Sequence, residues 1–367
     1  MIPVNEPVIG AAESAYVREC LETGWVSSAG RFIDTFEESW AAYCGMRHGV
    51  AVANGTVALQ LALAALGLPP GSEVIMPTFT IISCALAATY NGLVPVLVDA
   101  QPDTWCMDVV QIEAKVTPKT RAIMPVHIYG HPVDMDAVRA VADAYGLVVV
   151  EDAAEAHGAT YRGRRAGGLG DMSCFSFYAN KLITTGEGGM VLTSDDALAA
   201  RARSLRNLAF RDDRRFYHTE AGFNFRLTNL QAALGLGQVE RIDEIVAAKR
   251  WMGEAYTAAL SGLPLRLPVE REWATNVYWM YGVVLEEAAG MDAVEFASRL
   301  AALGVQTRPF FLGMHEQPVF LERGLFAGER YPVAERLARY GLYLPSGLAL
   351  TDQQQAAVVA AVREVLA

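Results

Sequence analysis

Short apolar runs rich in β-branched residues alternate with longer runs rich in alanine and leucine over the first two thirds of the chain. The short runs, such as LVVVED at 147–152, lack polar alternation, which is typical of strands buried on both faces under crossover helices. The strands that this pattern predicts are His48–Ala53, Glu73–Pro77, Pro95–Asp99, Ala122–Val126, Leu147–Glu151, Ser173–Phe177 and Gly189–Thr193. The repeated strand-then-helix order predicts a layered α/β domain with a mostly parallel sheet.

The intervening segments have helical spacing of apolar residues, and the pattern becomes wholly helical after Asp195. The predicted helices are Thr56–Leu66, Ile81–Tyr90, Val109–Lys115, Met135–Tyr145, a segment through Arg206, and a long one from Thr228 to about Leu260. The segment LSGLPLRLPVE at 260–270 contains two prolines and marks a boundary. We predict a large domain over residues 1–260, with an N-terminal arm of about residues 1–13, and a smaller C-terminal α+β domain over residues 261–367.

The composition excludes several classes of protein. An apolar content of 52% with 19% charge is typical of a globular chain, and a formal charge of −11 opposes sequence-independent binding to nucleic acids or anionic membranes. The N-terminus MIPVNEPVIG lacks the pattern of a signal peptide, and prolines interrupt the longest uncharged run, at 74–98. Five scattered cysteines without a C-x-x-C pair oppose a disulfide framework and a zinc site, so we expect a cytoplasmic protein without a metal.

Lysine is rare, and one lysine has an unusual context. Only four of the 30 basic residues are lysines, and for Lys115, Lys119 and Lys249 we predict a solvated surface position. Lys181 lies between CFSFYAN and LITTGEGGMVL. A lysine among apolar groups loses hydration of its ammonium form, which lowers its pKa and makes the amine a Schiff-base nucleophile. The alternative is an ordinary lysine at a strand end whose amine reaches water.

Two further features suit a pyridoxal phosphate (PLP) site. Asp152 ends a buried strand at the edge where open α/β sheets bind ligands, and PLP needs such an acid to keep its ring nitrogen protonated. Asn54, Gly55 and Thr56 lie between a strand and a helix, where backbone N–H groups and a hydroxyl can hold a phosphate. Each has a simpler alternative, because Asp152 could cap the following AAEAHGA and N-G-T could be only a capped turn.

Three long motifs, EDAAEAHGA, FSFYANKLITTGEGGM and GFNFRLTNLQAALGLGQVER, closely resemble the DegT/DnrJ/EryC1/StrS family of PLP-dependent nucleotide-sugar aminotransferases. The likeness extends over almost the whole chain. It implies the aspartate-aminotransferase fold (PLP fold type I), a homodimer with active sites at the subunit interface, L-glutamate as amino donor, and a cofactor that alternates between PLP and pyridoxamine phosphate.

The resemblance also implies roles for individual residues. Lys181 matches the Schiff-base lysine, Asp152 the acid at the pyridine nitrogen, and Glu155 the residue near the phenolic oxygen. The residues that match phosphate contacts are Gly55, Thr56, Ser176 and Asn224, the last of which would reach the phosphate bound in the partner subunit.

Some positions depart from the family pattern or match it less specifically. The aromatic residue that usually stacks on the cofactor ring falls on Ile81, so either this aliphatic side chain covers the ring or Phe79 helps from nearby. Gly313 stands where relatives often carry proline. The residues in motifs that border the sugar pocket are Trp25, His127, Arg308 and His315, and each could equally be structural.

The motifs NKLITTGEGG and MPVHIYGHPVDMD are most similar to those of family members that aminate C4 of GDP-4-keto-6-deoxy-D-mannose and form GDP-perosamine. The resemblance thus implies a role in deoxysugar supply for O-antigen or another polysaccharide. Two alternatives stay open: an aminotransferase for a dTDP- or UDP-linked 4-keto or 3-keto sugar, and a cofactor-free regulatory or scaffolding protein on the same fold.

Overall fold

The computed structural model describes residues 1–211 and 213–367. Its centre is a seven-stranded sheet with the order β1-β9-β8-β5-β4-β2-β3. The strands are β1 (His48–Val52), β2 (Glu73–Pro77), β3 (Val94–Val98), β4 (Thr120–Ile123), β5 (Val148–Asp152), β8 (Met172–Ser176) and β9 (Gly189–Thr193). β9 runs antiparallel to both of its neighbours, β1 and β8. The remaining neighbouring pairs, β8-β5, β5-β4, β4-β2 and β2-β3, are parallel. This confirms the prediction of a mostly parallel sheet.

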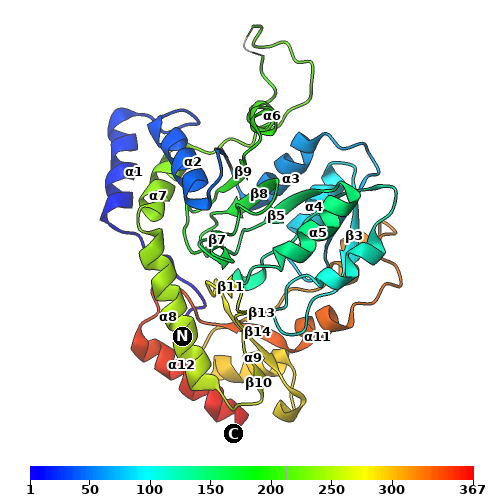
Figure 1. Ribbon diagram of the computed structural model, residues 1–367. Helices are drawn as coiled ribbons and strands as arrows, with labels where there is room; N and C mark the ends of the chain where they lie inside the picture. The colour runs from blue at the N-terminus through cyan, green and yellow to red at the C-terminus, as the bar shows by residue number, and fades with distance from the viewer. Residues whose placement is uncertain (212) are drawn as a thin grey trace.

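Helices cover the sheet, as Figure 1 shows. The α-helices are α1 (Ala11–Thr23), α2 (Arg31–Cys44), α3 (Gly55–Leu66), α4 (Ser83–Tyr90), α5 (Met135–Tyr145), α6 (Asp196–Arg206), α7 (Asn229–Val239), α8 (Ile242–Leu260), α9 (Ala293–Ala302), α10 (Pro318–Leu321), α11 (Pro332–Tyr340) and α12 (Asp352–Leu366). α3 packs on β8 and β9, whereas α5 packs on β4 and β5. Asn54 and Asp134 cap α3 and α5 through their side chains, which fixes where each helix begins.

Three predicted elements differ clearly from the structure, and the bounds of the others agree to within two residues. The segment Val109–Lys115 forms two short 3₁₀ turns, because the Asp108 side chain caps a tight first turn at Val110. The predicted strand Ala122–Val126 is β4 at Thr120–Ile123, since Pro125 has no N–H to donate to a ladder. The predicted helix from Thr228 is broken into α7 and α8 at 240–241, where the Arg241 guanidinium turns to the Glu13 carboxylate, 2.9 Å away.

The C-terminal part forms a second, antiparallel sheet with the order β10-β12-β14-β13. Its strands are β10 (Leu265–Arg266), β12 (Tyr281–Leu285), β13 (Arg308–Pro309) and β14 (Gly341–Leu344), and a small third sheet contains β6 (Thr160–Tyr161), β7 (Arg164–Arg165) and β11 (Ala274–Thr275). The long helix α8 runs between the two regions (Figure 1). Its Ile245 packs in the central core and its Tyr256 in the C-terminal core, so one helix serves both.

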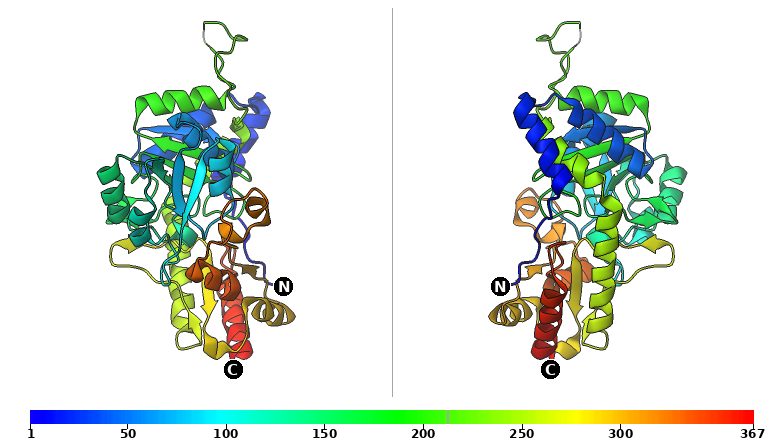
Figure 2. Two further views of the ribbon diagram at one scale, coloured as in Figure 1. Left: turned by 90° about the vertical axis from the view of Figure 1, so that its right-hand side faces the viewer. Right: turned by 90° about the vertical axis from the view of Figure 1, so that its left-hand side faces the viewer.

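The N-terminal segment crosses between the same two regions. Ile2 pairs with Val305 of the C-terminal part, and the chain then leads to α1, which packs on α7 (Figure 2). Residues 1–10 are therefore held by both regions, and the division at residue 260 stays a prediction. Within the described ranges, no helix is both long and apolar enough to cross a membrane.

Candidate functional site

The candidate site lies where β5 and β8 end. Asp152 is the last residue of β5 and Ser176 the last of β8, and these neighbouring strands are parallel. Their ends therefore meet at one edge of the sheet, where open α/β sheets bind ligands. Lys181 follows Ser176 in the next loop, so the fold brings together the lysine, the acid and one hydroxyl that the sequence singled out.

Lys181 is held in a largely dehydrated position. Its side chain is 10% exposed, and its Nζ lies 3.8 Å from Glu155 Oε1 and 3.6 Å from the centre of the Trp279 ring. Burial lowers the pKa of Lys181, and the carboxylates of Glu155 and Asp152 oppose this shift. The neutral, nucleophilic amine is therefore easier to form here than on a lysine in water.

Glu155 is buried beside that amine. Its Oε2 accepts a hydrogen bond of 2.7 Å from the backbone N–H of Tyr129, which has a left-handed conformation at φ 51°. Such strain in a residue with a side chain persists only where the surroundings enforce it, and it is common at functional sites. Burial raises the pKa of Glu155, although the charge of Lys181 counteracts it. Burial thus shifts the proton affinities of the Lys181 amine and the Glu155 carboxyl toward each other.

Asp152 is buried and receives two hydrogen bonds. The thiol of Cys84 donates to Oδ2 over 3.1 Å, and the N–H of Ala154 donates to Oδ1 over 3.1 Å. Burial raises the pKa of Asp152, and the two donors and Lys181 counteract the shift. The bond from Ala154 is a capping contact, as the alternative interpretation of Asp152 required, but the residues that follow form turns.

The start of α3 lies against the end of β8 and provides hydrogen-bond donors for an anion. Gly55 packs so closely on Ser176 that a Cβ at position 55 would lie 2.7 Å from the Ser176 Cβ. Thr56 Oγ1 lies 2.7 Å from Ser83 Oγ, and the ring N–H of His157 donates to the Ser176 carbonyl over 2.9 Å. The first N–H groups of α3, where Val57 already donates to Asn54, and the paired hydroxyls of Thr56 and Ser83 thus lie beside the end of β8, which suits a phosphate. Together with the buried acid and amine, this donor set fits PLP.

Other predicted residues lie at the surface of the chain. Trp25 is 58% exposed, Ile81 is 40% exposed, and Asn224 and Arg308 are also exposed. Phe79, the alternative to Ile81, is buried against Tyr129 and two phenylalanines. The roles of these surface residues toward cofactor and substrate stay predictions.

The two predicted histidines are buried and hydrogen-bonded within the chain. His127 Nε2 lies 3.0 Å from Glu151 Oε2, and the N–H of Val133 donates to its Nδ1 over 3.0 Å. His315 Nδ1 lies 2.8 Å from Thr78 Oγ1, at the end of β2. Both histidines therefore have structural partners, and their contact with a sugar stays a prediction.

Sequence reasoning missed three residues near the site. Cys84 contacts Asp152, as described, and the Trp279 indole N–H donates to the Asn180 carbonyl over 2.8 Å while its ring contacts Lys181. The surface position predicted for Lys249 is wrong: it is buried and donates to the carbonyls of Trp279, over 3.0 Å, and of Ser346. Burial lowers the pKa of Lys249 to about 7.

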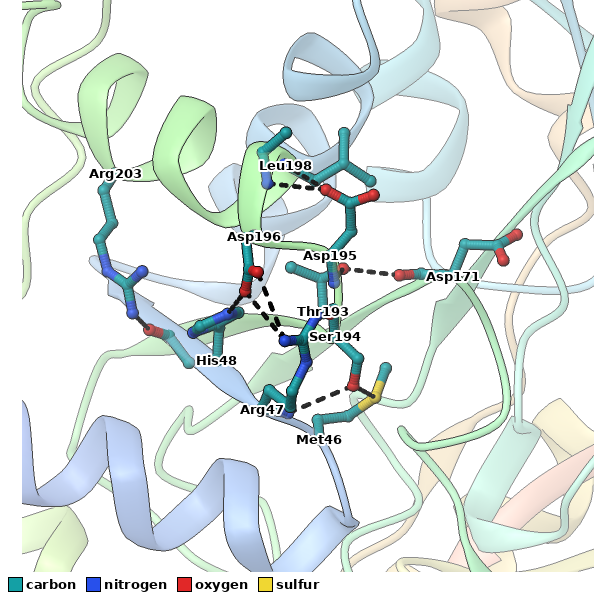
Figure 3. A network of polar contacts seen from close by, with 12 residues as sticks. Met46, Arg47, His48, Asp171, Thr193, Ser194, Asp195, Asp196, Leu198 and Arg203 are labelled. Atoms are coloured by element: carbon teal, nitrogen blue, oxygen red, sulfur yellow. Dashed lines mark hydrogen bonds and ion pairs between the residues drawn. The ribbon is translucent and has the colours of Figure 1, made fainter.

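A different polar cluster lies at the opposite edge of the sheet (Figure 3). Asp196 at the start of α6 accepts from His48 over 2.6 Å and lies 3.2 Å from the Arg47 guanidinium. The hollow beside it has a volume of about 820 Å³, against about 10 Å³ for the one beside Lys181. Its charged groups are paired and open to water, so each pair contributes little, in contrast to the buried amine and carboxylates around Lys181.

Known proteins resemble this chain over its whole length. A model of the DegT/DnrJ/EryC1/StrS aminotransferase family matches residues 7–363. The GDP-perosamine synthase of Caulobacter vibrioides is 46% identical over 367 residues, which cover 100% of this chain and 98% of the relative. The dTDP-3-amino-3,4,6-trideoxy-alpha-D-glucose transaminase of Streptomyces venezuelae is 40% identical over 92% of this chain and 89% of its own.

Two solved structures share the fold. The structure of DesI in the presence of its TDP-sugar product has a TM-score of 0.90 and 35% identity, and the alignment covers 100% of this chain and 93% of that one. The PLP form of Spr1654 from Streptococcus pneumoniae has a TM-score of 0.92 and 25% identity, with 100% and 98% covered. A PMP form of Spr1654 has also been solved.

Proposed function

The chain belongs to the DegT/DnrJ/EryC1/StrS aminotransferase family, and on that premise we propose that it moves an amino group from L-glutamate to C4 of GDP-4-keto-6-deoxy-D-mannose, which gives GDP-perosamine. The broader activity needs no proposal: the protein is a PLP-dependent nucleotide-sugar aminotransferase. The proposal concerns the nucleotide, the sugar, the donor and the residues that act.

We assign the central role to Lys181. Bound PLP supplies an electron sink that stabilises negative charge on the reacting carbon. The Lys181 amine, with its pKa lowered by burial, holds the cofactor at rest and, when released, removes a proton from the α-carbon of the donor. Glu155 Oε1, 3.8 Å from Lys181 Nζ, stabilises the ammonium form that results. The lysine thus serves as both anchor and general base.

The other site residues orient the cofactor. Asp152 holds a proton at the ring nitrogen, and its burial makes this ion pair strong because little water competes with it. The first N–H groups of α3, with Thr56 and Ser176, bind the phosphate. Ile81, exposed beside α4, would cover one face of the ring in place of an aromatic side chain.

The choice of a GDP-linked sugar rests on one observation, the 46% identity with the Caulobacter vibrioides GDP-perosamine synthase along nearly all of both chains. The second candidate is a dTDP-linked keto sugar. It is favoured by the 40% identity with the Streptomyces venezuelae transaminase and by the likeness to DesI, which was solved with a TDP-sugar product.

We also propose a homodimer with shared active sites. Trp25, Ile81 and Tyr178 are large apolar side chains that lie on or next to the candidate site segments, yet each is at least 40% exposed in the single chain. Asn224 is likewise exposed, and it pairs with Asn207 directly after α6. A second copy would cover the apolar groups and receive Asn224.

The test uses the PLP-bound protein. Incubation with L-glutamate should bleach its visible absorbance, and after removal of glutamate the addition of GDP-4-keto-6-deoxy-D-mannose should restore the absorbance and yield an amino sugar detectable by mass spectrometry. Recovery with dTDP- or UDP-linked keto sugars and not with the GDP sugar would overturn the proposed substrate. A failure to bleach with L-glutamate while another amino acid succeeds would overturn the proposed donor.

A further inference from the structure

Cys84 lies in the first turn of α4 and is directed toward the site residue Asp152. Its thiol is fully buried, 3.1 Å from Asp152 Oδ2, and Thr80 Oγ1 lies 3.6 Å from the same sulfur. When the thiol donates to Asp152, the Thr80 hydroxyl is free to donate to the sulfur. The three side chains then form a buried line of hydrogen bonds that ends on the carboxylate, and each bond polarises the next.

These contacts favour the charged form of Asp152. Removal from water penalises a carboxylate, and donors aimed at its oxygens offset that cost. The backbone N–H of Ala154 serves Oδ1, whereas the thiol is the side-chain donor on Oδ2. The other titratable groups around Asp152 are Lys181, His127, Glu155 and Cys174. Lys181 and His127 also favour the charged carboxylate, while Glu155 opposes it when ionised.

We propose that Cys84 is a positioning residue that keeps Asp152 ionised and turned toward the ring nitrogen of the bound cofactor. This inference rests on the role proposed above for Asp152. By stabilising the carboxylate, the thiol favours the pair of carboxylate and protonated ring nitrogen over the pair of neutral acid and neutral ring. The protonated ring is the better electron sink, so Cys84 acts on the reaction without touching the substrate.

The chain offers a matched control in Cys174. It is also fully buried, it lies on β8 directly opposite Asp152, and its backbone carbonyl accepts from Ala153 over 2.9 Å. Among the hydrogen bonds of the described residues, none joins the Cys174 thiol to Asp152. A Cys→Ala change at 174 therefore removes the same atom from the same neighbourhood and leaves the carboxylate with its thiol donor.

The first experiment titrates the visible absorbance of the PLP-bound protein. Positive charge on the ring nitrogen repels a second proton on the conjugated system, so a less protonated ring should raise the pH midpoint of the absorbance change. We expect Cys84→Ala to raise it by about half a pH unit and to lower kcat about fivefold. Cys84→Ser keeps a hydrogen-bond donor, so its pH midpoint and its kcat should lie close to those of the parent. Cys174→Ala should match the parent in both quantities.

A second measurement needs no cofactor. In the PLP-free protein, the infrared S–H stretching band assigned by the difference between parent and Cys84→Ala should lie lower than the band assigned with Cys174→Ala, because donation weakens the S–H bond. Equal frequencies would overturn the hydrogen bond on which the inference depends. Thermal unfolding of each variant shows that it is folded.

The remaining outcomes separate this inference from the role of Asp152. If Asp152→Asn moves the pH midpoint and Cys84→Ala does not, Asp152 acts as proposed and the inference about Cys84 is wrong. If Cys84→Ala and Cys174→Ala shift it equally, the effect comes from repacking and the inference again fails. If Asp152→Asn leaves the pH midpoint unchanged, the proposed role of Asp152 is wrong. The inference about Cys84 is then wrong as well, because it rests on that role.

Discussion

The two ends of the central sheet carry similar charged residues in opposite surroundings. We call the end where β5 and β8 finish, near Lys181, the carboxyl edge, and the end where they begin, near Asp196, the amino edge. At the carboxyl edge, Lys181 and Glu155 have side chains that are 10% and 6% exposed, and their charged atoms stand 3.8 Å apart. At the amino edge, Arg47 and Asp196 are 59% and 72% exposed and lie 3.2 Å apart. The amino edge also has the larger hollow, about 820 Å³. We nevertheless propose the catalytic site at the carboxyl edge.

The difference is physical. Charges in water gain little from pairing, because the solvent already stabilises each of them. Charges removed from water have proton affinities that depend on their neighbours, which is the property that acid–base catalysis needs. The amino edge in Figure 3 is therefore a solvated ion-pair network, and the volume of a hollow is a poor guide to chemistry.

The largest effect should come from Lys181→Ala. Because both cofactor attachment and proton transfer use this amine, we expect transamination to fall at least about a thousandfold. The melting temperature should not fall, since a buried amine with a lowered pKa is removed. Steady-state assays and thermal unfolding check this. A variant that keeps a tenth of the parent rate would contradict the assignment.

Asp152→Asn should have the next largest effect. The amide keeps the shape of the side chain and loses its negative charge, so kcat should fall about a hundredfold. The matched control is Asp171→Asn: Asp171 immediately precedes β8 at the amino edge, where it pairs with Arg139 over 3.1 Å. If both variants lost activity equally, the contrast between the two edges would be wrong.

Lys249→Met separates the effect of burying a lysine from the effect of catalysis, because Lys249 is buried and contacts only backbone carbonyls among the polar groups of the described residues. Burial lowers its pKa from 10.5 to about 7. Between these pH values the unfolded chain binds a proton that the folded chain does not, so the parent gains stability with rising pH.

Relative to Lys249→Met, the unfolding free energy of the parent should rise between pH 7 and 10.5, by about 1.4 kcal/mol per pH unit at most. Denaturant unfolding at a series of pH values measures this slope. Turnover should change far less than in Lys181→Ala. A slope of zero would show that Lys249 keeps an ordinary pKa.

Lys249 also shows what sequence reasoning can and cannot predict. The buried residues Ile245, Val246, Met252 and Tyr256 recur at helical spacing along α8, and position 249 falls on that stripe. The spacing of apolar residues therefore indicates that position 249 is buried, whereas the charge of lysine favours an exposed position, and the prediction followed the charge. The central strands were predictable for the converse reason, because parallel strands buried on both faces have uninterrupted apolar runs.

The residues of the candidate site likewise fall into those that local sequence predicts and those that depend on tertiary packing. Asp152 and Gly55 could be found because they lie at a strand end and a helix start, where local pattern predicts position, and Lys181 because of the apolar and small residues that flank it. The contact between Cys84 and Asp152 joins residues 68 positions apart, and that between Trp279 and Asn180 joins residues 99 positions apart. Such contacts depend on how the helices and the second sheet pack on the central sheet. The spacing of apolar residues along one segment does not predict that packing.

The smallest effect should come from Asp196→Asn at the amino edge. The hydrogen bond from His48 and the charge of Arg47 lower the pKa of Asp196, so its contribution to stability is present above its ordinary value of 3.8 and is lost as the pH falls below it. Because the pair is exposed, we expect the melting temperature at pH 7 to fall by no more than about 2 °C, and less in high salt. Transamination should equal that of the parent. A tenfold loss of turnover in this variant would give the larger hollow a function and would break the contrast between the two edges.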